Sequence, residues 1–313
     1  MARERGYQII ILSKSNKINH RLFSSTRYKI PCSFISGFTD AEGSFMIKFT
    51  KPSLNRGWKI GLEFSIRLHV KDISVLSKIK NCFSVGTLTS NDKMAVYSVR
   101  SLKDIMNVIL PHFDQFPLIT QKRADYLLFK DAALFMNDKK HLSLEGLQHI
   151  VNIRASMNKG LTTNLILFFH KSVGLTRPNV SLQNIDNDWV AGFTSGDGSF
   201  GILINSRNNV SLRLTLSQDA RERNLMDSFK TFFGCGNVYK NKTTLDYRVI
   251  QFNPIHDIII PFFKSHKIIG VKNLDFMDWI LAASIIKQGR HTTVEGLNEI
   301  KLIKERMNKN RVV

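Results

Sequence analysis

Two carboxylates, Glu42 and Asp197, occupy the same place in two near copies of one short sequence. The first copy reads FISGFTDAEGSF over 34–45 and the second reads WVAGFTSGDGSF over 189–200, so each acid comes immediately before a glycine. If the copies pair, two buried carboxylates lie side by side, and both stay ionised at low cost only when cations bind between them. The spacing therefore favours a cation site shared by two acids.

The similarity between the two halves continues well beyond these motifs. Further residues recur at a constant offset of 150 positions: Pro111, Lys122, His141, Glu145, Gly146, Met157 and Asn158 return as Pro261, Lys272, His291, Glu295, Gly296, Met307 and Asn308. Such self-similarity indicates one structural unit written twice. We expect a first unit over 32–154 and a second over 189–313, with a linker over 155–188 between them and a basic extension over 1–31.

Each motif is predicted to be a helix with one face of small residues. Two such residues lie four positions apart in each motif and therefore on one helix face: Gly37 with Ala41, and Gly192 with Gly196. A glycine inside a helix costs about 1 kcal/mol, and close packing of the two helices would offset that cost. We expect Gly43 and Gly198, which follow the acids, to end each helix in the left-handed conformation.

Strand and helix patterns follow each motif in the same order. Apolar and polar residues alternate over 62–69 and 212–217, which predicts half-buried strands. Helical spacing, a glycine turn, a further strand and closing helices come next in both halves. Each half therefore reads as an α+β unit whose sheet packs on helices with one side and is open on the other.

The composition indicates the class of partner. The chain has 45 Lys and Arg against 25 Asp and Glu, a formal charge of +20, while 43% of it is hydrophobic. A folded core with a strongly positive exterior is typical of a polyanion binder. The charge is spread along both halves, and no apolar run approaches the roughly 18 residues of a membrane span. The cysteines lack metal-ligand spacing and no Walker-type phosphate loop is present, so neither zinc nor ATP is suggested.

The first thirty residues differ from the rest of the chain. They contain seven Lys and Arg but a single acid, and the segment 21–27 is rich in Arg and Ser, as mitochondrial transit peptides are. An extension left by the surroundings of the gene would have the same composition.

The two motifs resemble those of the LAGLIDADG homing endonucleases, in the single-chain form that carries two motifs. The resemblance covers about 32–311, and the strings over 111–122 and 141–160 are similar to fungal mitochondrial intron-encoded members. It implies two αββαββα units related by a pseudo-two-fold axis. The motif helices would pair at the centre, and two antiparallel sheets would form a saddle over the DNA major groove. It also favours a mitochondrial protein, although a chloroplast protein would look similar.

Carried over residue by residue, the resemblance implies that Glu42 and Asp197 hold Mg²⁺, together with the preceding residues Ala41 and Gly196. Ca²⁺ or Mn²⁺ would act as substitutes. Hard oxygen ligands suit Mg²⁺, and two-metal chemistry would activate a water and stabilise the leaving oxygen. The second motif departs from the family pattern, with Ser195 where an acid is common and Asp197 where Glu is common.

Two further catalytic residues are implied by the resemblance. Gln218, at the end of a strand, would order the catalytic water, and Lys103 would steady the scissile phosphate. Their counterparts at an offset of 150 positions are Leu68 and Asn253, so the two halves differ in their polar catalytic groups. A strand of about ten residues spans about 33 Å, and each half would follow about 10 bp. The residues expected on the DNA face alternate with core positions: Lys48, Glu63, Arg67, Arg100, Arg213 and Arg248.

The favoured function is a Mg²⁺-dependent, site-specific endonuclease that makes a double-strand cut and promotes the mobility of its own intron. Two alternatives stay open at this point: an RNA maturase that assists the splicing of a group I intron, and a catalytically inactive DNA-binding remnant. Intron RNA would be the maturase's partner. Because both active-site halves lie in one chain, we expect a monomer on double-stranded DNA, without a membrane.

Overall fold

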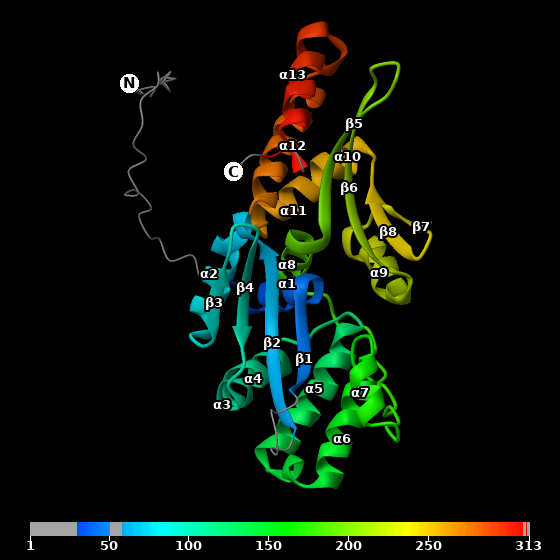
Figure 1. Cartoon of the computed structure of the whole chain (residues 1–313). Helices are drawn as coiled ribbons and strands as arrows, with labels where there is room; N and C mark the ends of the chain where they lie inside the picture. Colours follow the sequence, from blue (N-terminus) through cyan, green and yellow to red (C-terminus); the bar gives the residue numbers. More distant parts are fainter. Residues whose placement is uncertain (1–29, 51–57, 309–310, 312–313) are drawn as a thin grey trace, which may run out of the picture.

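The computed structural model describes residues 30–50, 58–308 and 311. The predicted transit peptide and nearly all of the basic extension lie outside these residues. Within the described part, the chain forms two units that meet at a central pair of helices (Figure 1). No helix of that part is long and apolar enough to cross a membrane.

The two units contain the same elements in the same order. The first unit and the linker contain α1 (Cys32–Glu42), β1 (Gly43–Thr50), β2 (Lys59–His69), η1 (Val70–Asp72), α2 (Ile73–Phe83), β3 (Thr87–Ser90), β4 (Met94–Val99), α3 (Leu102–Asp104), α4 (Leu110–Gln115), α5 (Lys122–Asn137), α6 (Leu144–Ala155) and, in the linker, α7 (Thr163–Phe168). The second unit contains α8 (Asn187–Asp197), β5 (Gly198–Ile204), β6 (Val210–Asp219), η4 (Ala220–Glu222), α9 (Arg223–Phe233), β7 (Asn237–Asn241), β8 (Thr244–Val249), α10 (Phe252–Pro254), α11 (Ile260–Ser265), α12 (Lys272–Lys287) and α13 (Val294–Glu305).

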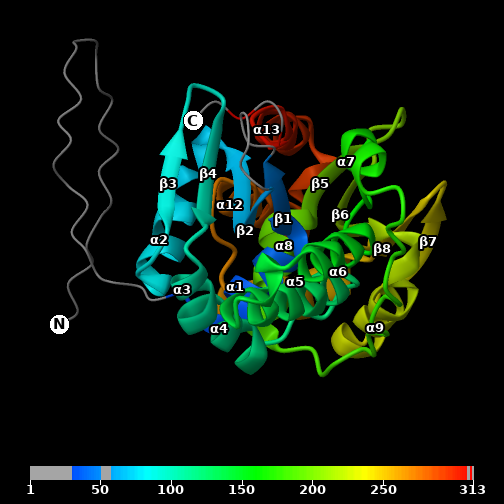
Figure 2. The same ribbon diagram turned by 60° about the horizontal axis from the view of Figure 1, so that its bottom comes forward.

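Each unit has one four-stranded antiparallel sheet, with the strand orders β1-β2-β4-β3 and β5-β6-β8-β7. Figure 2 shows the sheets side by side, with β1 and β5 innermost and β3 and β7 at the outer edges. Helices cover one face of each sheet, and we call the other, open side the strand face. The predicted α+β fold of two αββαββα units is confirmed.

The apolar residues of each unit form a separate core between its sheet and its helices. Phe45 in β1 and its counterpart Phe200 in β5 are fully buried there, each surrounded by other aromatic rings. Ala191 of α8 belongs to the first core, while Ala41 of α1 packs against the second. The motif helices therefore join the two cores across the unit boundary.

The small residues of α1 and α8 allow these two helices to pack backbone against backbone. A Cβ atom on Gly37 would collide with the carbonyl oxygen of Trp189, and one on Gly192 would collide with that of Phe34. A Cβ atom on Gly196 would collide with the side-chain Cβ of Ala41. The prediction of close packing between small faces is confirmed, and the two clashes over Gly37 and Gly192 are pseudo-symmetric.

The prediction for the glycines that end these helices was wrong. Gly43 has φ −80° and ψ 161°, and Gly198 has φ −79° and ψ 156°, so both are extended rather than left-handed. Each is the first residue of a strand, which continues directly from the helix. Glycine is required for space, since a Cβ atom at either position would collide with Thr39 or Thr194 one turn earlier.

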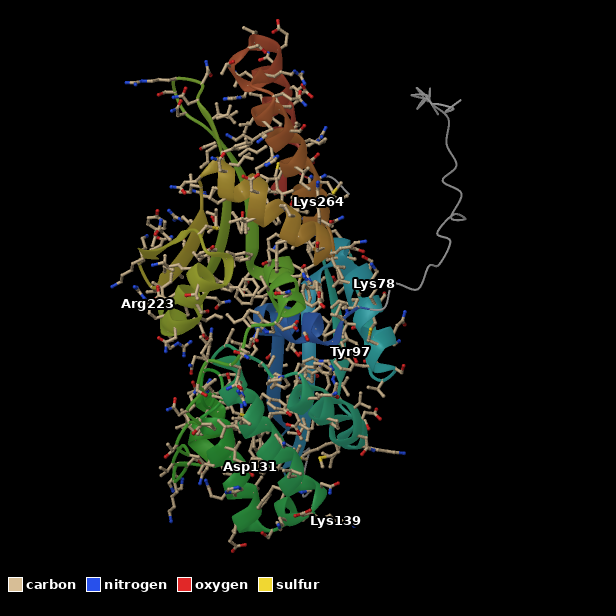
Figure 3. The ribbon with its side chains drawn as sticks, turned by 180° about the vertical axis from the view of Figure 1, so that it is seen from behind. Lys78, Tyr97, Asp131, Lys139, Arg223 and Lys264 are labelled. Carbon is tan, nitrogen blue, oxygen red and sulfur yellow. The ribbon has the colours of Figure 1, made fainter. Side chains whose placement is uncertain are left out.

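Charged side chains are spread over the helical side of both units. Seen from behind in Figure 3, Lys139 and Asp131 lie on the first unit, and Arg223 and Lys264 lie on the second. All four are exposed to solvent. This distribution matches the even spread of charge along the sequence.

Candidate active site

The packing of α1 against α8 brings Glu42 and Asp197 together at the C-terminal ends of the two helices. Both side chains are half-buried. Burial raises the pKa of Asp197 to about 6, and the negative charge of Glu42 contributes to that rise. Burial likewise raises the pKa of Glu42 above its ordinary value. The two acids are therefore close enough to repel one another, as the repeated motif predicted.

Two half-buried lysines complete this cluster. Lys122, the first residue of α5, donates from Nζ to the carbonyl oxygens of Thr39 at 2.9 Å and Asp40 at 2.8 Å. Lys272, the first residue of α12, donates to the carbonyl oxygens of Thr194 at 3.3 Å and of Gly196. Each ammonium thus neutralises the negative end of a motif helix.

The protonation of these lysines is balanced between burial and the acids. Burial lowers the pKa of Lys272 to about 8, and the charges of Asp197 and Glu42 oppose that shift. Burial also lowers the pKa of Lys122, against the charges of Asp40, Asp197 and Glu42. The charges of both lysines act on both motif acids, so all four groups form one electrostatic cluster.

Two cavities related by the pseudo-symmetry open onto this cluster. The first, which we call the Glu42 pocket, has a volume of about 280 Å³ and is lined by Glu42, Leu68, Asp72 and Lys272 among others. The second, the Asp197 pocket, has a volume of about 790 Å³ and is lined by the counterparts Asp197, Gln218, Glu222 and Lys122 among others. Each pocket therefore combines the motif acid of one unit with the lysine of the other unit.

The structure brings Gln218 to the site and leaves its counterpart apolar. The side-chain amide of Gln218, in β6, donates a hydrogen bond to the Asp197 carboxylate. Leu68 occupies the matching position near the end of β2 and lines the Glu42 pocket. The predicted difference between Gln218 and Leu68 is therefore present in the structure. The additional polar group, Gln218, lies beside Asp197, the shorter of the two motif acids.

The departure at Ser195 concerns packing rather than the reacting groups. Asp40, its counterpart, is buried and accepts hydrogen bonds from the Ile119 amide at 2.8 Å and the Trp189 indole at 2.9 Å. Ser195 accepts the equivalent bond from the Ile269 amide at 3.1 Å. Both residues tie a motif helix to the segment before its lysine, so a serine can replace the acid here.

Ala41 and Gly196 take part through their backbone only. The carbonyl oxygen of Ala41 lies 3.4 Å from Lys122 Nζ, and the carbonyl oxygen of Gly196 accepts from Lys272. A carbonyl oxygen has two lone pairs, so these bonds leave room for a second partner at each.

The structure does not bring Lys103 to the site. It lies exposed in α3, beyond the end of β4, whereas the start of β4 pairs with the end of β2 that carries Leu68. Ser101 caps α3 and turns the chain into the helical layer. The cations beside the acids are instead the half-buried Lys122 and Lys272, whose recurrence at an offset of 150 positions was the available sequence signal.

The residues predicted for the DNA face differ in burial and in their ion-pair partners. Glu63 is buried, with Lys48 Nζ at 2.7 Å from its carboxylate and Arg100 bonded to the same oxygen. Burial alone would raise the pKa of Glu63, but these two partners lower it below its ordinary value. The side chain expected to face DNA is therefore a buried anchor for two exposed cations.

The remaining predicted cations are less uniform. Arg67, in β2, is exposed, and Arg213, in β6, is half-exposed. Arg248, in β8, pairs with Asp246 at 2.6 Å and lies over the ring of Tyr239.

Comparison with known proteins agrees with this arrangement. The family model described as LAGLIDADG endonuclease matches residues 35–133 and 190–283, which cover both motifs. A Neurospora crassa protein named "Probable intron-encoded endonuclease 3" is 37% identical over 86% of this chain and 52% of its own length. A second from that fungus, "Probable intron-encoded endonuclease 2", is 37% identical over 93% of this chain and 70% of its own. The chain thus spans about half the length of the first of these relatives.

Solved structures are similar over nearly the whole chain. The LAGLIDADG homing endonuclease I-GzeII, in complex with its DNA target, is 43% identical with a TM-score of 0.87, over 90% of this chain and 100% of that one. The homing endonuclease I-SmaMI bound to cleaved DNA is 39% identical with a TM-score of 0.88, over 91% and 99% of the two chains. With both motifs matched and this degree of identity, the chain belongs to the LAGLIDADG endonuclease family.

Proposed function

We propose that the protein is a site-specific endonuclease that cuts both strands of a double-stranded DNA target with the help of divalent cations. The observation that carries this proposal is the pair of pseudo-symmetric pockets, each lined by one motif acid and one half-buried lysine. Hydrolysis of a phosphodiester develops negative charge on oxygen, and a preorganised ammonium stabilises such charge in a half-buried site. The similarity to structures bound to a DNA target and to cleaved DNA supports this activity.

Each pocket would serve one strand of the duplex. The pseudo-two-fold relation between the pockets matches the approximate two-fold relation between the strands of DNA. In the Asp197 pocket, Gln218 holds the carboxylate in place while Lys122 supplies positive charge. In the Glu42 pocket, Lys272 is the matching cation. Because the pockets differ in their polar groups, the two strands would be cut at different rates.

A divalent cation fits the donor set at the cluster. Among the described residues, no group of three or more His, Cys, Asp or Glu side chains is assembled. A cation would therefore rely on the carboxylates of Glu42 and Asp197, the carbonyls of Ala41 and Gly196, water and the DNA phosphate. It would offset the burial and the negative charge of Glu42, which together raise the pKa of Asp197. Oxygen donors of this kind suit Mg²⁺, with Ca²⁺ or Mn²⁺ as substitutes, and the bound cation would polarise the phosphate and acidify water.

The strand face of both sheets would hold the DNA. A formal charge of +20 provides the attraction to a polyanion. Lys48 and Arg100, held by Glu63, and the exposed Arg67 would contact the half-site of the first unit. Arg213 and Arg248 would contact the half-site of the second unit. As both halves of the site lie in one chain, the enzyme would act as a monomer.

The relatives favour this activity over the alternatives. Those reported above are named as endonucleases or are bound to DNA, which does not favour an RNA maturase. The complete cluster of acids and lysines disfavours an inactive remnant. Another similar protein, from Saccharomyces cerevisiae, is called "Uncharacterized mitochondrial protein RF1", and the relatives are named as intron-encoded. These names support our proposal that the protein acts in mitochondria and that its cut promotes intron mobility.

The test is cleavage of a pooled random-site DNA library by the wild type and the Glu42→Gln variant, in Mg²⁺ and in Ca²⁺. The proposal predicts one discrete double-strand cut by the wild type in Mg²⁺ and none by the variant, with both proteins binding the selected site. Ca²⁺ is the binding condition, as a neighbour was solved with uncleaved DNA in its presence. A double-strand cut by Glu42→Gln would refute the site, and binding without cutting by the wild type would refute the activity.

A further inference from the structure

Two acids outside the motifs make matching hydrogen bonds across the unit boundary. Glu222, the last residue of η4, accepts from the backbone N–H of Gln121 through Oε1 at 2.7 Å. Asp72, the last residue of η1, accepts from the backbone N–H of Val271 through Oδ1 at 2.7 Å. Both acids and both amides are separated by the offset of 150 positions, so the two bonds are equivalent under the pseudo-symmetry.

The amides that these acids bind directly precede the active-site lysines. Gln121 is the N-cap residue of α5, which begins at Lys122, and Val271 is the N-cap residue of α12, which begins at Lys272. Neither Gln121 nor Val271 caps its helix with its own side chain. A carboxylate from the other unit thus lies at the positive end of each helix, where negative charge is stabilising.

The backbone around the second of these bonds is shaped to admit the acid. Gly270 has φ +91°, and a Cβ atom there would lie 2.6 Å from Asp72 Oδ1. Its counterpart is Thr120, whose hydroxyl donates to Asp40 at 2.6 Å. The chain therefore has a glycine at the position that Asp72 approaches. At the counterpart position on the Glu222 side it has a threonine, whose side chain hydrogen-bonds to Asp40.

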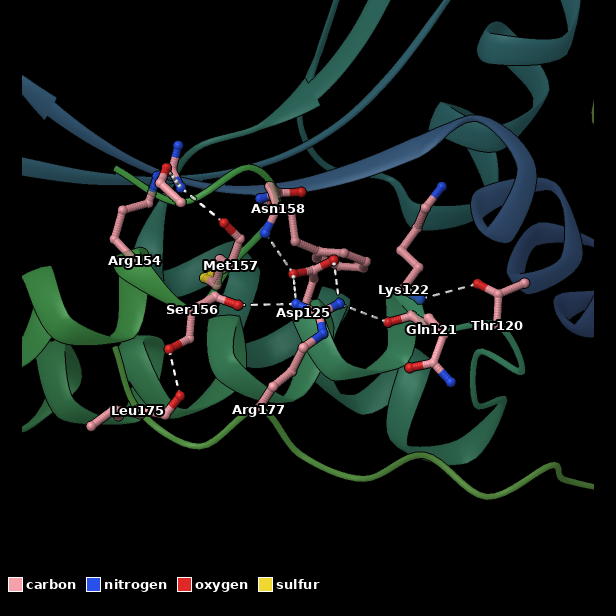
Figure 4. A network of polar contacts seen from close by, with 12 residues as sticks. Thr120, Gln121, Lys122, Asp125, Arg154, Ser156, Met157, Asn158, Leu175 and Arg177 are labelled. Atoms are coloured by element: carbon pink, nitrogen blue, oxygen red, sulfur yellow. Dashed lines mark hydrogen bonds and ion pairs between the residues drawn. The ribbon is translucent and has the colours of Figure 1, made fainter. Parts of the chain in front are cut away.

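The backbone of Gln121 is held at its carbonyl as well. Its carbonyl oxygen accepts from Arg177 of the linker at 3.1 Å, and the same guanidinium binds Asp125 and the Ser156 carbonyl (Figure 4). The N–H points to the second unit and the C=O to the linker. The residue before Lys122 is thus fixed by two segments outside its own helix.

From these contacts we propose that Asp72 and Glu222 are positioning residues, each of which holds the start of the other unit's lysine-bearing helix so that the lysine reaches its pocket. Glu222 positions Lys122 in the Asp197 pocket, and Asp72 positions Lys272 in the Glu42 pocket. The inference rests on the proposed function for its effect on cutting. Its structural part, the fixing of one peptide by one acid, is independent of that function.

The experiment compares single-turnover cleavage of each strand of the target, with the two strands labelled separately. The variants are Glu222→Ala, Glu222→Gln, Asp72→Ala and Asp72→Asn, with Lys122→Met and Lys272→Met as references for each pocket. Lys122→Met identifies the strand that the Asp197 pocket cuts. Glu222→Ala should slow cleavage of that same strand by about tenfold, the effect of one lost buried hydrogen bond. It should change the cleavage rate of the other strand by less than about twofold. Asp72→Ala should slow the opposite strand. The amide variants keep an oxygen acceptor and should restore most of the rate.

The ratio of the two strand rates separates positioning from general damage. A loss of folded protein lowers both rates together and leaves their ratio unchanged. Equal slowing of both strands by Glu222→Ala, or a Glu222→Gln variant as slow as Glu222→Ala, would overturn the proposal.

Hydrogen exchange measured by mass spectrometry tests the same contacts without any cleavage. Glu222→Ala should speed amide exchange over residues 118–125 and leave 268–275 unchanged, while Asp72→Ala should do the reverse. Unchanged exchange in both segments would refute the positioning role. If the wild type cuts no DNA but the two variants show these exchange changes, only the proposed function is refuted.

Discussion

The two pockets of this molecule share a backbone plan and differ in the side chains placed on it. The Asp197 pocket has a short motif acid, a glutamine bonded to it, and a lysine whose helix is held by a long acid, Glu222. The Glu42 pocket has a long motif acid, a leucine in place of the glutamine, and a lysine whose helix is held by a short acid, Asp72. The two pockets thus have their acids and lysines at equivalent positions, while the lengths of the acidic side chains differ.

The difference teaches which contacts the pseudo-symmetry requires. Backbone contacts recur on both sides: helix on helix, lysine on carbonyl, acid on peptide N–H. Side-chain partners such as Gln218 and Thr120 occur on one side only. The shared contacts should therefore govern folding and the assembly of the site, and the unshared ones should set the rate on each strand.

The largest effect is expected at the shared helix packing. Gly37→Ala and Gly192→Ala should each destabilise the protein by more than about 4 kcal/mol, since the new methyl would collide with a backbone carbonyl that cannot move aside. Thermal unfolding measures this. Gly61→Ala is the matched control, because nothing lies within 4 Å of its Cβ position. A mild effect of either helix variant, or very unequal effects of the two, would break the symmetric account.

The next effect concerns the acid that holds α5. Burial raises the pKa of Glu222 to about 7 from the ordinary 4.5, with Asp40 and Asp219 adding to the rise and the Gln121 amide and Arg221 opposing it. The folded state thus binds this proton more tightly than the unfolded state does. The stabilisation that follows is complete below the ordinary pKa and is lost as the pH rises through about 7.

Glu222→Gln should therefore gain stability relative to the wild type between pH 5 and pH 8, by at most about 3 kcal/mol. Urea unfolding of both proteins across this range measures the difference. Parallel curves for the two proteins would show that Glu222 has an ordinary pKa and is not a buried charge. Asp72→Asn, at the counterpart acid, is the comparison variant.

A smaller effect is expected where the pockets differ. Gln218→Leu should slow cleavage by about tenfold on the strand that Lys122→Met affects, because the carboxylate of Asp197 loses a hydrogen bond that orients it. Leu68→Gln, at the counterpart position, should change neither strand by more than about twofold. Strand-resolved cleavage measures both. A slower opposite strand in Gln218→Leu would contradict the assignment of Gln218 to the Asp197 pocket.

The smallest effect is expected at Lys103, for which the family resemblance implied a contact with the scissile phosphate. Because it is exposed in α3 and away from the acids, Lys103→Ala should leave both strand rates within about twofold of the wild type. Single-turnover cleavage at saturating enzyme is the appropriate measurement. A large loss in one strand would restore the sequence-based role for this residue.

Much of the fold and the centre of the site could be predicted from the sequence. The repeat fixed the two units, and the small residues in each motif predicted the helix pair that brings Glu42 and Asp197 together. These features depend on local patterns, namely a period, an offset and a helix face. Such patterns can be read without knowing the tertiary contacts.

The parts that were missed depend on contacts between distant segments. Lys122 and Lys272 were visible as repeated residues, but only the packing of α5 and α12 on the motif helices shows that their ammonium groups lie beside the acids. Glu63 alternates as a surface residue does, yet it is buried under two cations, Lys48 from β1 and Arg100 from just after β4. Gly43 and Gly198 looked like left-handed caps, whereas the strands begin there without a turn.

The central claim is that each pocket pairs the acid of one unit with the lysine of the other and acts on one strand. Strand-resolved cleavage by Lys122→Met and Lys272→Met tests this most directly, with the exposed Lys139→Met as the matched control. The account predicts that the two variants nick opposite strands, that the control cuts both strands normally, and that Gln218→Leu follows Lys122→Met. Nicking of the same strand by both lysine variants, or equal slowing of both strands by each, would contradict it.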